Sequence, residues 1–120
     1  MKLDEAQALH AFGALSQETR LRMVRVLVTA GPDGMAAGAV GDAVGASASS
    51  ASFHLANLVR AGLVRSRREA RSIVYSADYA GLSGLVDFLL QDCCQGHPAM
   101  CTLRERNQSG AGGMVGQDPG

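Results

Sequence analysis

The amino-acid sequence predicts one mostly α-helical domain with a small β-hairpin. Apolar residues recur at helical spacing along most of the chain, and two adjacent short segments near its middle read as strands instead. Hydrophobic residues make up 47% of the sequence, much of that content is alanine, and aromatic residues make up only 4%. Such a composition suits closely packed helices better than a β-sandwich. The 120 residues are enough for one domain, and dimerisation would help so small a domain bury apolar surface.

Two helices are predicted in the first thirty residues. Apolar residues at helical spacing mark the first, over residues 3–14: Leu3, Ala6, Leu9 and Phe12. Ser16 is a suitable N-cap for the second helix, and Glu18 supplies an acid in its first turn. The expected apolar face of that second helix consists of Leu21, Val24, Leu27 and Val28. The sequence Gly-Pro-Asp-Gly at 31–34 ends it.

The next segment has the pattern of a helix-turn-helix. We predict a short helix over residues 35–44, ended by Gly45, and a second helix over 48–60, capped by Ser47 and closed by Gly62. The second of these helices is expected to bury Phe53, Leu55 or Leu58, and Val59. Two helices joined by a tight glycine-containing turn are typical of DNA-binding units.

A hairpin and a last helix complete the prediction. We predict two strands over residues 63–68 and 72–76, joined by a turn at 69–71. This hairpin would be the wing of a winged helix-turn-helix. The final helix is predicted over 79–94, before Gly96 and Pro98. Its broad apolar stripe consists of Leu82, Leu85, Val86, Leu89 and Leu90.

Domain limits and partners follow from composition and charge. We assign residues 1–106 to the winged domain and 107–120, which are rich in Gly, Ser and Gln, to a disordered tail. The formal net charge is zero, but residues 43–77 hold five arginines and a single acid, Glu69. A local basic patch of this kind is sufficient to contact phosphates. No segment resembles a membrane span or a signal peptide, so we expect a cytoplasmic protein that does not act at a membrane.

Candidate DNA-contacting residues lie in the predicted recognition helix and wing. Serines in the first turns of a helix can reach phosphates and base edges, and arginines on a hairpin can straddle the backbone or enter the minor groove. The set consists of Ser49, Ser50, Ser52, His54, Arg65, Arg67, Arg68 and Arg71. The alternative is an ordinary solvated helix and charged hairpin. That alternative explains any isolated serine well, but it explains the combined set poorly.

Two segments resemble the arsenic-repressor (ArsR-like) family of dimeric winged-helix metal sensors. Leu15-Ser16-Gln17-Glu18-Thr19-Arg20-Leu21 is similar to the opening of that family's second helix. Ser49-Ser50-Ala51-Ser52-Phe53-His54-Leu55, with Leu58 and Ala61-Gly62-Leu63-Val64, is similar to its recognition helix and first wing strand. The resemblance covers residues 5–95 and implies a DNA-binding repressor. The family often has Gln where this chain has Ala48, which leaves the operator sequence open.

Three cysteines, Cys93, Cys94 and Cys101, cluster beyond the last apolar stripe. Adjacent cysteines are poorly placed for a structural disulfide, and thiols stay reduced in the cytosol. Three thiolates suit trivalent arsenic or antimony and would also serve lead or cadmium, and His97 would complete a zinc set. The arrangement resembles arsenite sensors that carry a cysteine pair and a third cysteine at the end of the last helix. Two alternatives are a pair of buried structural cysteines and a thiol redox sensor.

We therefore predict a homodimeric repressor in which the first and last helices form the dimer interface. Its operator would be an imperfect inverted repeat of double-stranded DNA, released when As(III) or Sb(III) binds the cysteines. No catalytic arrangement and no organic cofactor site are evident, so an enzyme is not expected. Three other interpretations of the function remain possible. They are a redox-responsive repressor, a zinc-, cadmium- or lead-responsive repressor, and an interaction module or enzyme fragment that uses the fold without binding DNA.

Overall fold

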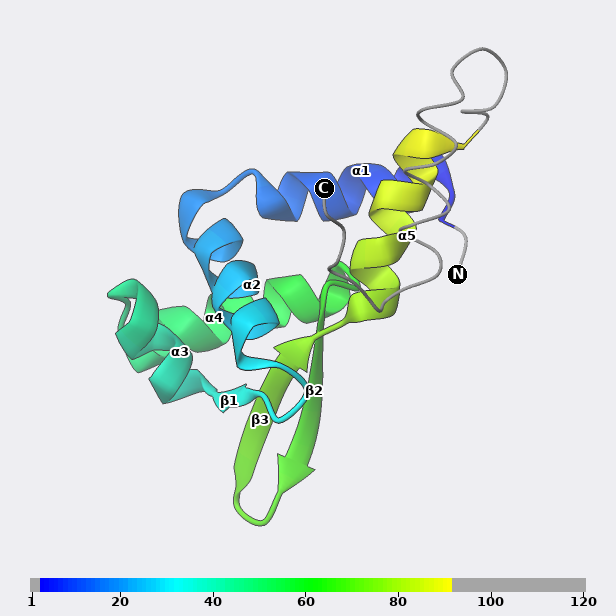
Figure 1. Cartoon of the computed structure of the whole chain (residues 1–120). Helices are drawn as coiled ribbons and strands as arrows, with labels where there is room; N and C mark the ends of the chain where they lie inside the picture. The colour runs from blue at the N-terminus through cyan, green and yellow to red at the C-terminus, as the bar shows by residue number, and fades with distance from the viewer. Residues whose placement is uncertain (1–2, 92–120) are drawn as a thin grey trace, which may run out of the picture.

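The helices and strands follow the predicted order, with one short strand added. The computed structural model describes residues 3–91 (Figure 1). The last helix ends earlier than the predicted residue 94, because it stops at Leu90 and Gln91 is already extended. Cys93, Cys94, His97, Cys101 and the tail at 107–120 lie outside the described residues. The elements are α1 (Glu5–Leu15), α2 (Glu18–Ala30), β1 (Met35–Ala36), α3 (Ala37–Val44), α4 (Ala48–Arg60), β2 (Val64–Glu69), β3 (Ser72–Ala77) and α5 (Tyr79–Leu90).

The first two helices begin at caps that differ from the predicted ones. Asp4 and Gln7 form a capping box at the start of α1, in which the Asp4 carboxylate accepts from the Gln7 amide at 2.7 Å. The expectation that Ser16 caps α2 is wrong. Gln17 is the N-cap and its side chain accepts from the Arg20 amide, whereas Ser16 ends α1 and donates to the Gly13 carbonyl at 2.8 Å.

The sheet contains a strand that we did not predict. Residues Met35 and Ala36, assigned to the start of a helix, pair with Tyr75 and Val74 of β3. The local pattern favours a helix there, but the free edge of the hairpin offers backbone partners that only the tertiary structure supplies. The three strands are antiparallel in the order β1-β3-β2, and the β2–β3 hairpin extends away from the helices (Figure 1).

The core lies between the helices and is built from small as well as large side chains. In α1 the buried residues are Ala8, Ala11 and Ala14, whereas Leu9 is 65% exposed. In α4 the prediction that Phe53 is buried is wrong, because its side chain is 63% exposed. The larger fully buried side chains are Met23, Leu27, Val40, Leu55, Leu58, Leu63 and Val64.

The start of α5 packs on the end of α4. Asp78 caps α5 by accepting from the Gly81 amide at 3.0 Å. A Cβ at Gly81 would overlap the carbonyl oxygen of Gly62, just beyond the C-terminus of α4. From there α5 runs beside α1, and the two helices contact one another (Figure 1). None of the described helices is both long and apolar enough to cross a membrane.

Candidate nucleic-acid interface

The turn between α3 and α4 is compact because of two glycines, Gly45 in the turn and Gly41 within α3. Gly45 ends α3 with φ +75°, a left-handed conformation that favours glycine. A Cβ at Gly41 would lie 2.7 Å from the Ala46 carbonyl oxygen, so the chain after the turn passes directly over α3. Ser47 then caps α4 by accepting from the Ser50 amide at 3.1 Å, as predicted. The result is a helix-turn-helix whose second helix has a fixed start.

The outer face of α4 differs from the predicted face in two residues, because Phe53 belongs to it and His54 does not. Ser49, Ser52 and Phe53 are exposed, and Ser50 is half-buried. Phe53 lies only about 40° around the helix from Ser49, because successive residues are about 100° apart. Ala51, Leu55 and Leu58 hold the opposite face in the core. Phe53 therefore belongs to the surface that α4 presents to solvent. The spacing of Phe53 from Ser49 is the sequence signal that could have indicated this.

His54 is turned from this surface towards the junction of α1 and α2. Its side chain is half-buried, and its Nδ1 atom lies 3.2 Å from Nη1 of Arg20. Because arginine only donates, Nδ1 of His54 is the acceptor. The Nε atom of Arg20 also donates to the Ala14 carbonyl at 2.9 Å, so Arg20 joins α4 to the end of α1. No feature of the sequence indicated this role for Arg20.

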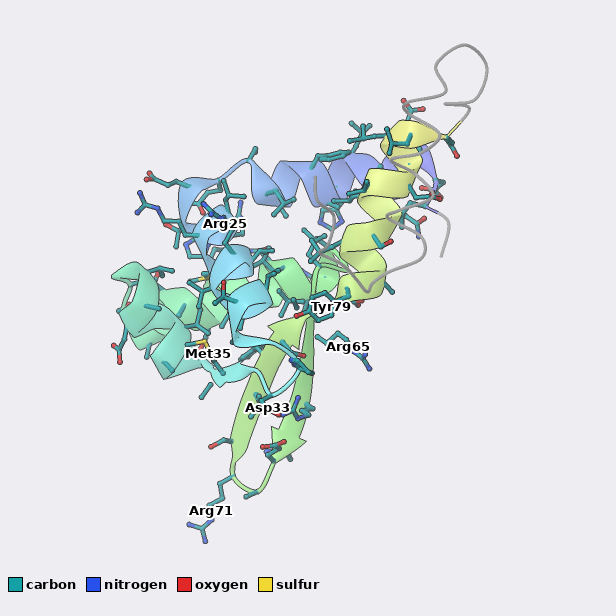
Figure 2. The ribbon with its side chains drawn as sticks, viewed as in Figure 1. Arg25, Asp33, Met35, Arg65, Arg71 and Tyr79 are labelled. Atoms are coloured by element: carbon teal, nitrogen blue, oxygen red, sulfur yellow. The ribbon has the colours of Figure 1, made fainter. Side chains whose placement is uncertain are left out.

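The wing carries exposed arginines along one strand and at its tip. Arg65 and Arg68 come from β2 and, because they are three residues apart, lie on opposite faces of the hairpin. Arg71 extends from the tip, and Arg65 points away from the sheet (Figure 2). All three are exposed, and within residues 3–91 none has an assigned hydrogen bond or ion pair. Their guanidinium groups are available to an anionic ligand.

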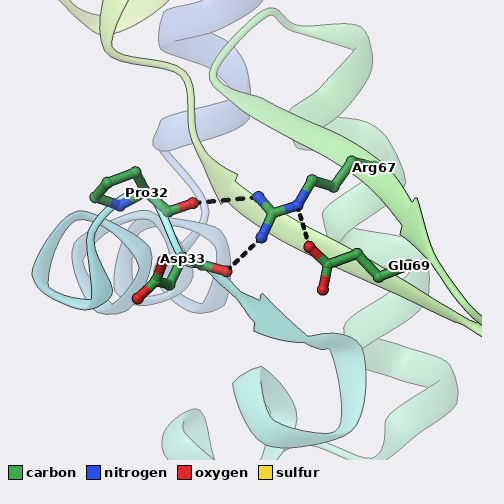
Figure 3. A network of polar contacts seen from close by, with 4 residues as sticks. All are labelled: Pro32, Asp33, Arg67 and Glu69. Carbon is green, nitrogen blue, oxygen red and sulfur yellow. Dashed lines mark hydrogen bonds and ion pairs between the residues drawn. The ribbon is translucent and has the colours of Figure 1, made fainter.

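Arg67 differs from the other wing arginines because its guanidinium group is bound to other residues of the protein (Figure 3). Its Nη1 and Nη2 atoms donate to the carbonyl oxygens of Pro32 and Asp33, at 3.2 and 2.8 Å. Its Nε atom also pairs with the Glu69 carboxylate at 2.7 Å. Arg67 thus ties β2 to the loop between α2 and β1 and fixes the orientation of the hairpin.

No metal site is found in the part of the chain that the structure describes. Residues 3–91 contain no group of three His, Cys, Asp or Glu side chains arranged to hold an ion. The predicted ligands Cys93, Cys94 and Cys101 lie beyond these residues, as does His97.

Comparison with known proteins places this arrangement in a family. The family described as a helix-turn-helix domain matches residues 15–67. An ArsR-like transcriptional regulator from Rhodococcus sp. RHA1 is 26% identical, with 83% of this chain and 92% of that chain covered and a TM-score of 0.65. Reduced HlyU from Vibrio cholerae is 30% identical, with 75% and 92% covered and a TM-score of 0.56. The chain belongs to the ArsR-like family of winged helix-turn-helix regulators.

A third structure adds to the ArsR-like assignment. The winged helix-turn-helix DNA-binding domain of a possible ArsR-family regulator from Mycobacterium bovis is homodimeric. It is 29% identical, with 75% of this chain and 79% of that chain covered and a TM-score of 0.58. No curated protein sequence matches the chain. The family and the winged helix-turn-helix fold, both predicted from the sequence, are confirmed, and the chain has the DNA-binding fold of ArsR-like transcriptional regulators.

Proposed function

We propose that this ArsR-like chain is a homodimeric repressor that binds operator DNA through α4 and the β2–β3 hairpin. The observation that carries the proposal is the exposed face of α4, with its polar Ser49 and Ser52, next in the chain to a hairpin on which Arg65, Arg68 and Arg71 have no assigned partner among residues 3–91. Serine hydroxyls can contact phosphates and base edges, and arginines neutralise phosphates. The protein is a regulator and not an enzyme.

The dimer is supported by an apolar surface on α1 and α5. Leu9 of α1 is 65% exposed and Leu89 of α5 is 64% exposed, with Val86 of α5 exposed as well. The two helices contact one another, and the related domain from M. bovis is homodimeric. Each side chain that a partner covers would contribute less than the about 1.5–3 kcal/mol of burying a fully exposed aliphatic side chain, because each is already partly covered in the monomer. A two-fold dimer would place two α4 helices in successive major grooves and read an imperfect inverted repeat.

We further propose that Cys93, Cys94 and Cys101 form the inducer site and bind As(III) or Sb(III) in the cytoplasm. The support is chemical, since three nearby thiols match the preference of soft ions for thiolates, and reducing conditions keep them available. The cysteine pair follows α5 closely in the chain, and α5 belongs to the proposed dimer surface. An ion bound there would change the dimer geometry and lower the affinity for a two-fold operator.

A redox-responsive repressor is the second candidate. Adjacent thiols can oxidise, and oxidation would change the same segment that an ion would bind. The related HlyU structure is that of the reduced protein. The oxidation state of the cysteines should therefore be controlled when DNA binding by this chain is measured. The two candidates share the DNA-binding unit and differ only in what reacts with the cysteines.

One titration tests these proposals together. A duplex is selected from a random library by the reduced full-length protein, and its affinity is measured by fluorescence anisotropy. Arsenite and antimonite should release it, whereas zinc, cadmium, lead and hydrogen peroxide should require higher concentrations. Release by peroxide in metal-free buffer at lower concentrations would favour the redox candidate. Release by zinc or cadmium at lower concentrations would favour a site that includes His97.

Cysteine variants test the inducer site separately from the DNA interface. Cys93→Ser and Cys94→Ser should bind the duplex as tightly as the wild type but should fail to release it with arsenite. Cys101→Ser should respond poorly to arsenite but retain a response to organic arsenicals, which need only two thiolates. If the first two variants release the duplex at the wild-type arsenite concentration, the cysteines are not the sensor. If the wild type selects no duplex, the DNA-binding proposal fails.

A further inference from the structure

Phe53 lies where a base-reading side chain is expected on a recognition helix. It shares the outer surface of α4 with Ser49 and Ser52, and its ring is 63% exposed. Residues that hold α4 in the core occupy the opposite side: Ala51, Leu55 and Leu58. A large aromatic ring at this position contributes little to the core and is available to a ligand.

The Phe53 ring is held by its neighbour. The rings of Phe53 and His54 meet edge to face, with centroids 5.6 Å apart and planes at 67°. His54 is in turn fixed by Arg20, which is bound to the Ala14 carbonyl. The contact with a fixed His54 favours one orientation of the Phe53 ring, and a ring that is already oriented loses less entropy on binding.

The side chain of the polar residue one turn beyond Phe53 is already hydrogen-bonded within its own helix. Asn57 donates from Nδ2 to the Phe53 carbonyl at 3.2 Å and accepts from Arg60 at 2.6 Å. Asparagine is a side chain that can read adenine, but this one is engaged with its own helix. The serines can contact any base, so they discriminate weakly. Phe53 is therefore the side chain on this surface with the strongest chemical preference.

We propose that Phe53 selects a thymine in each operator half-site by packing on its 5-methyl group. The proposal rests on the DNA binding proposed above. Among the four bases, thymine alone presents a methyl group in the major groove, beside its O4 acceptor, whereas the other three present hydrogen-bonding groups without a methyl group. An apolar ring against those polar groups would desolvate them without a partner, which is unfavourable. A 5-methylcytosine presents the same methyl group, so it shares the recognised chemistry.

Removing or adding single 5-methyl groups in the DNA tests this proposal without altering the protein. In the selected duplex each thymine is replaced in turn by deoxyuridine, which pairs identically but lacks the methyl group. The wild type should lose about fourfold in affinity at one thymine per half-site, which corresponds to the ~0.8 kcal/mol of one buried methylene-sized group. Exchange of that T·A pair for C·G should weaken binding, and 5-methylation of the cytosine should recover about fourfold.

Protein variants assign the effect to Phe53. Phe53→Ala should bind the thymine duplex more weakly and should no longer distinguish it from the deoxyuridine duplex. Phe53→Leu, which keeps an apolar side chain, should retain part of the distinction. Val28→Ala removes an exposed aliphatic side chain from α2 and should keep the full distinction, as the matched control.

The outcomes separate this inference from the function on which it rests. If the wild type binds a selected duplex but no deoxyuridine substitution changes its affinity, the thymine proposal is overturned while DNA binding stands. The same holds if Phe53→Ala discriminates thymine from deoxyuridine as well as the wild type does. If no duplex is selected at all, both proposals are overturned together.

Discussion

Gly81 at the start of α5 lies directly against the backbone carbonyl of Gly62, where α4 ends. The contact joins the helix that precedes the cysteine cluster to the helix that carries Ser49, Ser52 and Phe53. A displacement of α5 would therefore be transmitted to the end of the proposed recognition helix without an intervening side chain. Within one subunit, this contact is where the helix that precedes the cysteines touches the chain just beyond the proposed recognition helix.

Gly81→Ala should destabilise the protein because the added Cβ would overlap the Gly62 oxygen. Overpacking costs about 1–3 kcal/mol, and the better helix propensity of alanine recovers up to ~1 kcal/mol. Thermal unfolding followed by circular dichroism should show a melting temperature several degrees lower. Gly38→Ala in α3 is the control, since nothing lies within 4 Å of its added Cβ. An unchanged melting temperature for Gly81→Ala would mean that α4 and α5 separate readily.

Arg67 and Arg68 should affect DNA binding differently, although both are wing arginines. Arg68→Ala should lower the slope of log affinity against log salt by about 0.9, the value for one lost phosphate contact. Arg67→Ala should weaken binding through a misplaced hairpin, with little change in slope, because its guanidinium is bound to Pro32, Asp33 and Glu69.

Arg67→Lys separates charge from geometry at this position. Lysine keeps the positive charge but cannot bridge both carbonyl groups and the Glu69 carboxylate with the same planar fork. The variant should therefore behave like Arg67→Ala. If Arg67→Lys binds DNA as the wild type does while Arg67→Ala loses a full unit of slope, Arg67 is a phosphate contact after all.

Ala70→Gly should stabilise the hairpin. Ala70 has φ +55°, in the left-handed region that disfavours residues with a Cβ. After allowance for the greater flexibility of glycine in the unfolded chain, we expect a gain of about 0.5–1 kcal/mol in the free energy of unfolding. Chemical denaturation measures it. Ala39→Gly, in the right-handed backbone of α3, is the matched substitution and should be destabilising. Loss of stability in Ala70→Gly would show that the turn has another conformation in solution.

Leu9→Glu or Leu89→Glu should convert the proposed dimer to monomers. Each places a charge within the exposed apolar surface of α1 and α5, where a partner would bury it. Analytical ultracentrifugation should detect the change, and affinity for a two-fold operator should fall with it. Val28→Glu introduces the same charge on α2 and should leave the dimer intact. Dimers that survive both leucine substitutions would place the interface elsewhere.

The sequence alone predicted the elements whose signals are local. Ser47 as the cap of α4 and the bounds 48–60 agree with the structure, because capping and helical periodicity depend on a few neighbouring residues. The wing strands are displaced by one residue or less at each end. The winged fold and the family followed from the order of these elements. The inducer cysteines and the dimer remain predictions.

Only the tertiary structure decided which side chains face outward and which arginines are available. Periodicity in α1 allowed Leu9 to be inside, but the helices approach closely over Ala8, Ala11 and Ala14, and Leu9 is left at the surface. Phe53 was displaced from the core in the same way, by the smaller Ala51 and by Leu55. Arg67 finds its carbonyl partners more than thirty residues away in the chain. Local patterns contain no information about such partners, because the partners exist only once the elements have packed together.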